Sequence, residues 1–204
     1  MTREDEWLFG WDETPGIVSV WADGTGRAHV FRRIPETRAL VHEHARFRPW
    51  VLLASLEDLV HLGDALASVP AADARGAPFT YEALEGPGAL RFRVHGNDQR
   101  ALHAAILTGA TRRVGRRLAH VRDLGADAIF TLPPEEQYLV STGRTYFRDL
   151  PFDALVRMQL DLETTGLDPE TSRIFLVAVR DSNGAATTLE AEGEGDAAEA
   201  DLIR

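Results

Sequence analysis

The sequence is dominated by short runs of β-branched and aromatic residues that glycine and proline repeatedly interrupt. Residues 16–22 and 27–33 are two such runs, and they flank Asp23-Gly-Thr-Gly26, which is typical of a tight turn between antiparallel strands. No apolar run approaches the ~18–20 residues that a membrane-spanning helix requires. The pattern therefore predicts a β-rich chain without a membrane span, whose core is assembled from many short elements.

Three helices are expected among these strands. Residues 55–66 open with the spacing of a capping box and carry leucines at helical spacing. Asn97 or Asp98 is placed to cap a second helix that has one apolar face. The third helix is expected over residues 133–143, because proline is tolerated in a first turn and the glutamates that follow suit the positive end of the helix dipole.

The remaining segments predict further strands and one long loop. Strands are expected at 50–54 and 89–94. Between them, residues 67–88 are rich in proline and glycine, so we expect mostly loop with a short ordered piece at 79–82. The last fifth of the chain is expected to form a separate unit. Its predicted elements are strands at 157–162, 173–180 and 186–191, a hairpin turn at 181–184 and a helix at 197–203.

Two amino acids are absent, and both absences narrow the function. The cysteine count is 0, which excludes disulfides, thiolate zinc sites, iron–sulfur clusters and cysteine nucleophiles. All 22 basic residues are arginine, which excludes a Walker-type phosphate loop and a Schiff-base lysine. The acidic N-terminus has no signal-peptide-like apolar stretch. With 44% hydrophobic residues the chain can bury a core, and a cytoplasmic location is expected.

Charge is unevenly distributed along the chain, whose formal net charge is −10. Residues 181–204 hold seven acids and one arginine, whereas residues 91–122, here named the basic segment, hold eight arginines and one acid. Within the basic segment, the pairs Arg112-Arg113 and Arg116-Arg117 are spaced to share one face of a helix. These four arginines are candidates for phosphate contacts in nucleic-acid binding. A solvated basic face that offsets the acidic C-terminus is the alternative.

Other residues that could carry function have simpler structural explanations. His95, His103 and His120 lie in the basic segment without the spacing of metal ligands, so surface or hydrogen-bonded histidines are expected. The four tryptophans could stack on nucleic-acid bases. Aromatic residues on strands are more often part of the core, which is the expectation for Trp7, Trp11, Trp21 and Trp50.

The segment most informative about chemistry is 158–169, Met-Gln-Leu-Asp-Leu-Glu-Thr-Thr-Gly-Leu-Asp-Pro. Asp161 and Glu163 stand two residues apart at the end of an apolar strand, so both carboxylates point to the same face of a sheet. Two oxygen ligands on a rigid strand suit Mg²⁺ or Mn²⁺ in a site that also uses waters and substrate phosphates. The alternative is a strand end that carries two solvated acids.

This segment resembles the first motif of DEDD-type 3'–5' exonucleases, which have the ribonuclease-H-like fold and use two divalent metal ions. Two upstream blocks resemble family B DNA polymerases in the same order. Phe47-Arg48-Pro49-Trp50 looks like a signature of their N-terminal domain, and Glu136-Gln-Tyr-Leu-Val-Ser-Thr-Gly143 looks like the segment before their exonuclease domain. The resemblance covers nearly the whole chain.

The resemblance implies both a fold and a set of site residues. It implies an α+β or α/β chain with a β-rich, polymerase-type N-terminal domain at 1–152. The opening strands of an incomplete ribonuclease-H-like exonuclease domain follow at 153–204. It also implies that Asp161 and Glu163 are catalytic and bind the metal ions, and that Thr164 and Thr165 contact nucleic acid.

The chain departs from the family pattern in its last part. The family's exonuclease uses four acids, and its final motif adds a tyrosine or a histidine. Here no tyrosine follows Tyr146 and no histidine follows His120, so half of the metal site is missing. The complete domain would hold two Mg²⁺ or Mn²⁺ ions. These 204 residues are expected to bind one at most, weakly, and not to degrade DNA by themselves.

The leading interpretation is therefore the N-terminal part of a family B-like DNA polymerase with a proofreading exonuclease. Its expected partner is DNA, as single-stranded 3' ends or a primer–template. A stand-alone 3'–5' exonuclease that continues beyond residue 204 is one alternative. The other is a non-catalytic nucleic-acid-binding module that retains half of a metal site.

Overall fold

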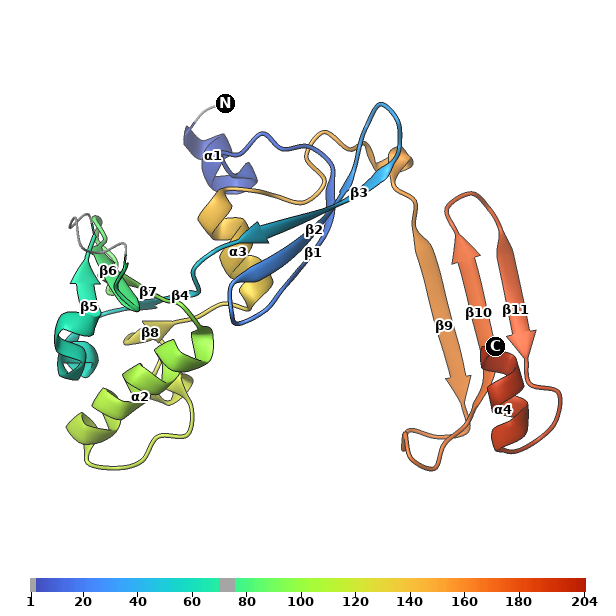
Figure 1. The fold of residues 1–204 in the computed structure, drawn as a ribbon. Coiled ribbons are helices and arrows are strands. Elements are labelled where there is room, and N and C mark those ends of the chain that lie inside the picture. Colours follow the sequence, from blue (N-terminus) through green and yellow to red (C-terminus); the bar gives the residue numbers. More distant parts are fainter. Residues whose placement is uncertain (1–2, 70–75) are drawn as a thin grey trace. The chain divides into compact units, whose positions relative to one another are not determined.

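The computed structural model of the chain describes residues 3–69 and 76–204, apart from the side chains of Arg3, Trp7 and Leu8 (Figure 1). It is a mixed α and β structure with three sheets among these residues. The chain divides into two compact units, Met1–Asp149 (unit 1) and Leu150–Arg204 (unit 2). Of the helices in the described part of the chain, none has the length and apolar character needed to cross a lipid bilayer.

The first sheet of unit 1 consists of three antiparallel strands in sequence order: β1 (Ile17–Ala22), β2 (Arg27–Arg33) and β3 (Leu40–Arg46). Val20 and Ala22 of β1 and Ala28 and Val30 of β2 are buried at period two, as burial of one sheet face requires, and a register shift between Ile17 and Ser19 brings Ile17 into the same core. This face packs against Tyr138 of helix α3 (Pro134–Thr142). The expected β1–β2 turn is confirmed. Strand β3 was not expected, because its residues are mostly exposed and carry no apolar alternation.

The second sheet of unit 1 has five strands in the order β5-β6-β7-β4-β8. Its core contains Val51, Val94, Leu102 and Ile106. Helix α2 (Gln99–Val114) covers this core, and Asp98 caps it by accepting a hydrogen bond from the Ala101 N–H at 2.9 Å, as expected. The strands are β4 (Trp50–Leu53), β5 (Leu66–Ser68), β6 (Phe79–Ala83), β7 (Phe92–Gly96) and β8 (Ile129–Phe130). Unit 1 also contains the helical turns η1 (Glu57–Ala65) and η3 (Val121–Leu124) and the helix α1 (Arg3–Phe9).

The expectation of a capped α-helix at residues 55–66 is wrong. Residues 57–65 form a 3-10 segment broken at Gly63, and Ser55 makes no capping box: its hydroxyl accepts a hydrogen bond from the Glu57 N–H only two residues on. The expected loop 67–88 contains β6, which pairs with β5 and β7. Residues 70–75 of that loop lie outside the described residues. The ordered piece at 79–82 is confirmed as part of β6.

The tryptophans divide between core and surface. Trp50 is buried at 3% exposure, as expected. Trp11 and Trp21 are 57% and 52% exposed, so the expectation that they belong to the core is wrong. The Trp11 ring lies against Gly143, where an added Cβ would come within 2.2 Å of it. Gly143 also ends α3 in the left-handed conformation, as the sequence predicts. The side chain of Trp7 lies outside the described residues.

Unit 2 contains one antiparallel sheet, β9 (Met158–Thr164), β10 (Ile174–Asp181) and β11 (Ala186–Glu190), with β10 in the centre. A 3-10 turn, η4 (Phe152–Ala154), precedes the sheet, and helix α4 (Asp196–Ile203) follows it. Arg173 pairs with Asp196 at 2.5 Å, and Glu199 accepts a hydrogen bond from the Ile174 N–H, so α4 is tied to the start of β10. These strands and the helix confirm the elements expected for the last fifth of the chain.

Helix α2 packs on η1 at Gly109, where an added Cβ would lie 1.7 Å from the carbonyl oxygen of Asp58. In an open helix, Gly→Ala gains about 1 kcal/mol of helix propensity. Here the clash with backbone outweighs that gain, so we expect Gly109→Ala to reduce the free energy of unfolding by about 1–3 kcal/mol. Urea denaturation measures the change. Gly115→Ala is unsuitable as a control, because the positive φ of Gly115 would strain an alanine even though the space around it is open. Gly76→Ala, with open space and no positive φ, serves as the control.

Asp23 closes the β1–β2 turn. Its carboxylate accepts hydrogen bonds from the Thr25 hydroxyl (2.7 Å) and backbone N–H (2.9 Å) and pairs with Arg27 (2.9 Å). The Thr25 hydroxyl contributes most to lowering the pKa of Asp23 to about 2. A depressed carboxyl pKa stabilises the fold above the unfolded value of 3.8, and this stability is lost as pH falls from about 4 towards 2.

We therefore expect Asp23→Asn to lower the free energy of unfolding by about 1–2 kcal/mol at pH 7, after allowance for solvent screening at this turn. The difference from the unmodified chain should shrink to near zero at pH 2. Asp127→Asn, at an exposed position, is the matched control. A difference that stays constant between pH 7 and pH 2 would contradict the assignment.

Candidate functional site

Asp161 and Glu163 lie on β9, the edge strand of the unit 2 sheet. The register places them opposite Ala178 and Leu176 of β10, two residues apart on both strands. Both carboxylates therefore leave the same face of the sheet, which confirms the geometric expectation. Leu160 and Leu162 alternate with them and project from the other face. We call the face with the carboxylates the acidic face.

The acidic face presents mixed charge around the two carboxylates. Asp161 Oδ1 accepts a hydrogen bond from the Leu162 N–H at 3.1 Å. Arg180, opposite Gln159, projects from the same face. Within residues 3–69 and 76–204, no third acid or histidine brings a ligand atom close enough to make a three-ligand site with this pair. The pair alone offers two oxygen ligands, which fits one hydrated Mg²⁺ or Mn²⁺ ion.

Thr164 and Thr165 act within the turn that joins β9 to β10. The Thr164 hydroxyl donates to the Gly166 carbonyl at 2.6 Å. The Thr165 hydroxyl accepts from the Arg173 N–H at 2.9 Å, and the Thr165 N–H donates back to the Arg173 carbonyl. Both side chains thus shape the loop after the carboxylates. Their contact with nucleic acid stays a prediction.

The basic segment does not form one helical face. Helix α2 ends at Val114, and Gly115 turns the chain with a φ of 69°, so Arg116 and Arg117 lie beyond the helix. The expectation that four arginines share a helix face is therefore wrong. Sequence spacing could not reveal this, because the left-handed turn at Gly115 is followed by Leu118, which is buried and draws the chain back towards the core.

Arg113 has a structural partner. Its guanidinium binds the buried Asp58 carboxylate with two hydrogen bonds of 2.8 and 3.0 Å, and these hydrogen bonds raise the pKa of Arg113 above its usual value. Glu57 lies 3.4 Å away. Arg113 therefore joins α2 to η1, whereas Arg112, Arg116 and Arg117 are exposed and remain candidates for phosphate contacts.

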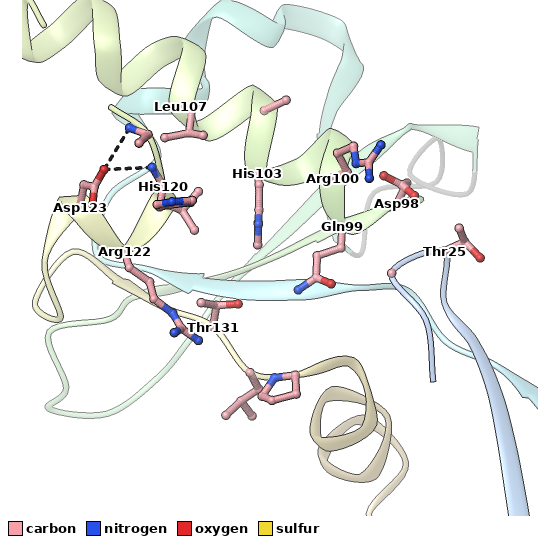
Figure 2. Close-up of a pocket in the computed structure, with 16 residues that line it drawn as sticks. Thr25, Asp98, Gln99, Arg100, His103, Leu107, His120, Arg122, Asp123 and Thr131 are labelled. Carbon is pink, nitrogen blue, oxygen red and sulfur yellow. Dashed lines mark hydrogen bonds between the residues drawn. The ribbon is translucent and has the colours of Figure 1, made fainter. Parts of the chain in front are cut away.

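A groove of about 1270 Å³ runs along α2 in unit 1 (Figure 2). The N-terminal part of α2 forms one wall, and η3 with residues 131–133 forms another. The β1–β2 turn closes one end, where the Gly24 carbonyl accepts a hydrogen bond from the Gln99 N–H at 2.7 Å. Figure 2 shows Gln99, His103 and Arg122 directed into the groove, with Arg100 at its rim.

The acids that line this groove accept hydrogen bonds from backbone N–H groups and so cap helical segments. Asp98 caps α2, and Asp123 accepts hydrogen bonds from the N–H groups of Ala119 (3.0 Å) and His120 (2.9 Å). Arg100 and Arg122 have no ion pair among the described residues, so their charges are available to a ligand. The groove is therefore suited to an anionic group such as a phosphate.

The three histidines of the basic segment differ in their surroundings. His95 is half-buried beside the Arg48 carbonyl at 3.4 Å, and His120 is exposed, as expected. His103 departs from the expectation, because its Nε2 is buried without a hydrogen-bond partner. Burial, followed by the charge of Arg122, lowers the pKa of His103 and keeps it neutral at pH 7. The sequence showed Arg100 and Arg122 only as members of a basic segment, without indicating that they share a groove.

Two motifs noted in the sequence meet inside unit 1. Trp50 donates from its backbone N–H to Gln137 Oε1 (2.8 Å) and from its indole Nε1–H to the Gln137 carbonyl (3.2 Å). The Gln137 Nε2 donates to the Leu132 carbonyl at 2.7 Å. Arg48, two residues before Trp50, donates instead to the Thr80 hydroxyl of β6 at 3.1 Å. The Phe47–Trp50 block and the 136–143 block therefore form one buried hydrogen-bonded junction.

Comparison with known proteins gives matches among solved structures only. No protein-family model and no curated protein matches the sequence. A solved structure, the family B DNA polymerase from the hyperthermophilic archaeon Pyrobaculum calidifontis, is similar at 16% identity and a TM-score of 0.49. The similarity covers 92% of this chain and 27% of that polymerase, so the chain spans about a quarter of its length.

The exposed arginines can be tested for phosphate contact in two sets. Arg112→Ala/Arg116→Ala/Arg117→Ala and, in the groove, Arg100→Ala/Arg122→Ala should each weaken binding of a single-stranded oligonucleotide. Each phosphate contact adds about 0.7 to the slope of log affinity against log salt, so we expect the slope to fall by about 2 and about 1.4. Fluorescence anisotropy over a salt series measures both.

Arg113 is left intact in these variants because its loss would break the pair with Asp58. Arg46→Ala, which removes an exposed arginine of β3 outside the basic segment, is the control and should leave the slope unchanged. Unchanged slopes in both variant sets would leave the basic segment as a solvated face.

Proposed function

We propose that this chain is the N-terminal region of a family B-like DNA polymerase. In this proposal unit 1 is the N-terminal domain, and unit 2 contributes the first strands of a ribonuclease-H-like 3'–5' proofreading exonuclease. The observation that carries the proposal is the shared face of Asp161 and Glu163 on β9, within the segment that resembles the first exonuclease motif. DNA is the proposed substrate, as single-stranded 3' ends or a primer–template.

The acidic face has the donor set that the proposed chemistry needs. Asp161 and Glu163 would hold divalent ions, which in such sites activate a water molecule and stabilise the leaving oxygen of the phosphodiester. The two carboxylates are exposed and accessible to hydrated Mg²⁺ or Mn²⁺. Arg180, on the same face, is placed to attract the phosphate backbone. The Thr165–Arg173 hydrogen bonds hold the adjoining loop in place.

The opposite face of the same sheet also fits this proposal. Met158, Leu160 and Leu162 on β9 are 71%, 56% and 45% exposed, and Leu189 on β11 shares their face. An exposed apolar patch of this kind marks a surface that packs against another element. In a complete exonuclease domain, further elements would cover this face and bring the remaining acids to the acidic face.

The junction of the two upstream motifs supports the same assignment for unit 1. The two blocks that resemble family B polymerases are 87 residues apart at Trp50 and Gln137, yet they hydrogen-bond to each other in the core. If the two sequence matches were accidental, there would be no reason for the two blocks to contact each other in the folded chain. Both blocks therefore serve the fold of unit 1 rather than chemistry.

A second function, nucleic-acid binding by unit 1 alone, is favoured by the groove beside α2. Its free arginines, Arg100 and Arg122, and its neutral His103 form a surface that would contact phosphates without any metal ion. Under this alternative, Asp161 and Glu163 would be solvated acids. The two functions differ in whether the acidic face binds a metal ion.

The decisive experiment measures Mn²⁺ binding by electron paramagnetic resonance. We expect one weakly bound ion on the purified chain and none on Asp161→Ala/Glu163→Ala, because two carboxylates supply −2 against the +2 of a single ion. The control is Glu192→Ala/Glu194→Ala, which removes the same charge at the same spacing from a turn outside the strands. Equal Mn²⁺ binding by the wild-type chain and Asp161→Ala/Glu163→Ala would contradict the proposal.

The same proteins are then incubated with an end-labelled single strand and Mn²⁺. We expect no digestion by the 204 residues. Correct positioning of the water and the ions can lower the activation free energy by about 7–11 kcal/mol, and an incomplete site loses that contribution. The polypeptide encoded by the complete reading frame should digest the strand, and Asp161→Ala/Glu163→Ala in that polypeptide should abolish digestion. Digestion by the isolated chain that the double variant abolishes would show that acids within these 204 residues complete the site.

A further inference from the structure

Three histidines gather on the solvent face of the first sheet of unit 1. His29 lies on β2, and His42 and His44 lie two residues apart on β3. The register pairs His29 with His44 and Phe31 with His42. Because paired and alternate residues project from the same face, all three imidazoles leave the sheet on one side. Ala28 and Val30, the two neighbours of His29 on β2, are buried on the other face.

The ring nitrogens of this histidine cluster are close together. One nitrogen from each ring lies within 4.8 Å of the other two. His29 Nδ1 and His42 Nε2 are 2.9 Å apart, close enough to share a proton. The ring centroids of His29 and His44 are 4.7 Å apart, and those of His42 and His44 are 4.5 Å apart. Among the described residues, no other group of three or more His, Cys, Asp or Glu side chains has its ligand atoms this close together.

Aromatic neighbours limit the positions of these rings. Phe31 stacks on His42 with centroids 4.5 Å apart and an interplanar angle of 4°. Trp21 of β1, paired with His29, meets it edge-on at 5.1 Å. His29 is partly buried, whereas His42 and His44 are exposed. The donors are therefore partly preorganised on rigid strands and remain accessible to an ion from solvent.

The charge around the histidine cluster does not prevent cation binding. Arg27 is the closest cation to His29 on β2, and its guanidinium is paired with Asp23 at 2.9 Å. Arg33 donates a hydrogen bond to the Arg38 carbonyl at 2.5 Å. Arg46, the remaining arginine on this face of β3, lies beyond His44 and opposite Arg27. The cluster presents nitrogen donors and no carboxylate.

We propose that His29, His42 and His44 form a binding site for Zn²⁺, with a water molecule as the fourth ligand. Zinc accepts three imidazole nitrogens at ~2.0–2.1 Å in tetrahedral geometry, which places the nitrogens ~3.3 Å apart. Rotation of the exposed His42 and His44 side chains would bring the nitrogens from their present separations, all within 4.8 Å, to that value. The shared proton between His29 and His42 would be replaced by the ion, since ligating histidines must be neutral and unprotonated at the bound nitrogen.

The donor set also separates this site from the acidic face of unit 2. Imidazole nitrogen favours zinc, cobalt, nickel and copper, whereas Mg²⁺ prefers oxygen ligands. The zinc site lies on β2 and β3 of unit 1 and uses none of the residues proposed to bind Mg²⁺ or Mn²⁺. It therefore stands or fails independently of the polymerase assignment.

The test uses the full chain without any histidine tag. Zinc stoichiometry and affinity are measured by competition with a chromogenic chelator, and Co²⁺ substitution is followed by the visible absorption that tetrahedral coordination produces. We expect one Zn²⁺ per chain. Removal of a partner that merely orients a ligand costs about 10–100-fold in affinity, so His44→Ala and His29→Ala should each cost about 100-fold or more.

A third cluster variant and two controls keep the outcome specific. His42→Phe retains an aromatic ring to stack on Phe31 while it removes the donor, and it should lose zinc without loss of the metal-free melting temperature. His61→Ala, at an exposed position of η1, should bind zinc as the unmodified chain does. Asp161→Ala/Glu163→Ala should also bind zinc normally. Absence of saturable zinc binding, or binding that the three cluster variants leave unchanged, would overturn the proposal.

Discussion

The architecture of unit 1 depends on the buried side chain of Gln137. It is fully buried, and its amide bonds both to the Trp50 N–H and to the Leu132 carbonyl. Helix α3, which carries Gln137, packs on the first sheet, while Trp50 begins β4, an inner strand of the second sheet. A buried amide left without these partners would be costly, so the hydrogen bonds set how the two sheets meet. They also position Leu132 and Pro133, which line the groove beside α2.

Two sheets in this chain each gather polar side chains of one kind on one face. The side chains are carboxylates in unit 2 and imidazoles in unit 1. In unit 2, alternation along β9 directs carboxylates to one face and apolar side chains to the other. In unit 1, the pairing of β2 with β3 gathers imidazoles on the face opposite the core. Oxygen donors suit hard cations and nitrogen donors suit zinc-like ions. One chain thus presents two chemically distinct sets of potential metal ligands, each on one face of a sheet.

Prediction from the sequence succeeded where signals were local. The Asp23–Gly26 turn, the Asp98 cap and the Gly143 end of α3 each depend on residues within a few positions of one another. It failed where long-range pairing decided the structure. Strand β3 has no apolar alternation and exists because it pairs with β2 over seven residues. Residues 57–65 have leucines at helical spacing, yet Gly63 and the packing of Gly109 on Asp58 favour a broken 3-10 segment.

The same distinction holds for the candidate sites. The sequence by itself determined that Asp161 and Glu163 share a face, because side chains alternate with period two along any strand. Only the tertiary structure decided that Arg113 is held by Asp58, that Arg122 and His103 line a groove, and that His29 meets His42 and His44. These residues are brought together by strand register and helix packing between distant segments. Spacing along the chain carries no record of that register, and the folded core supplies it.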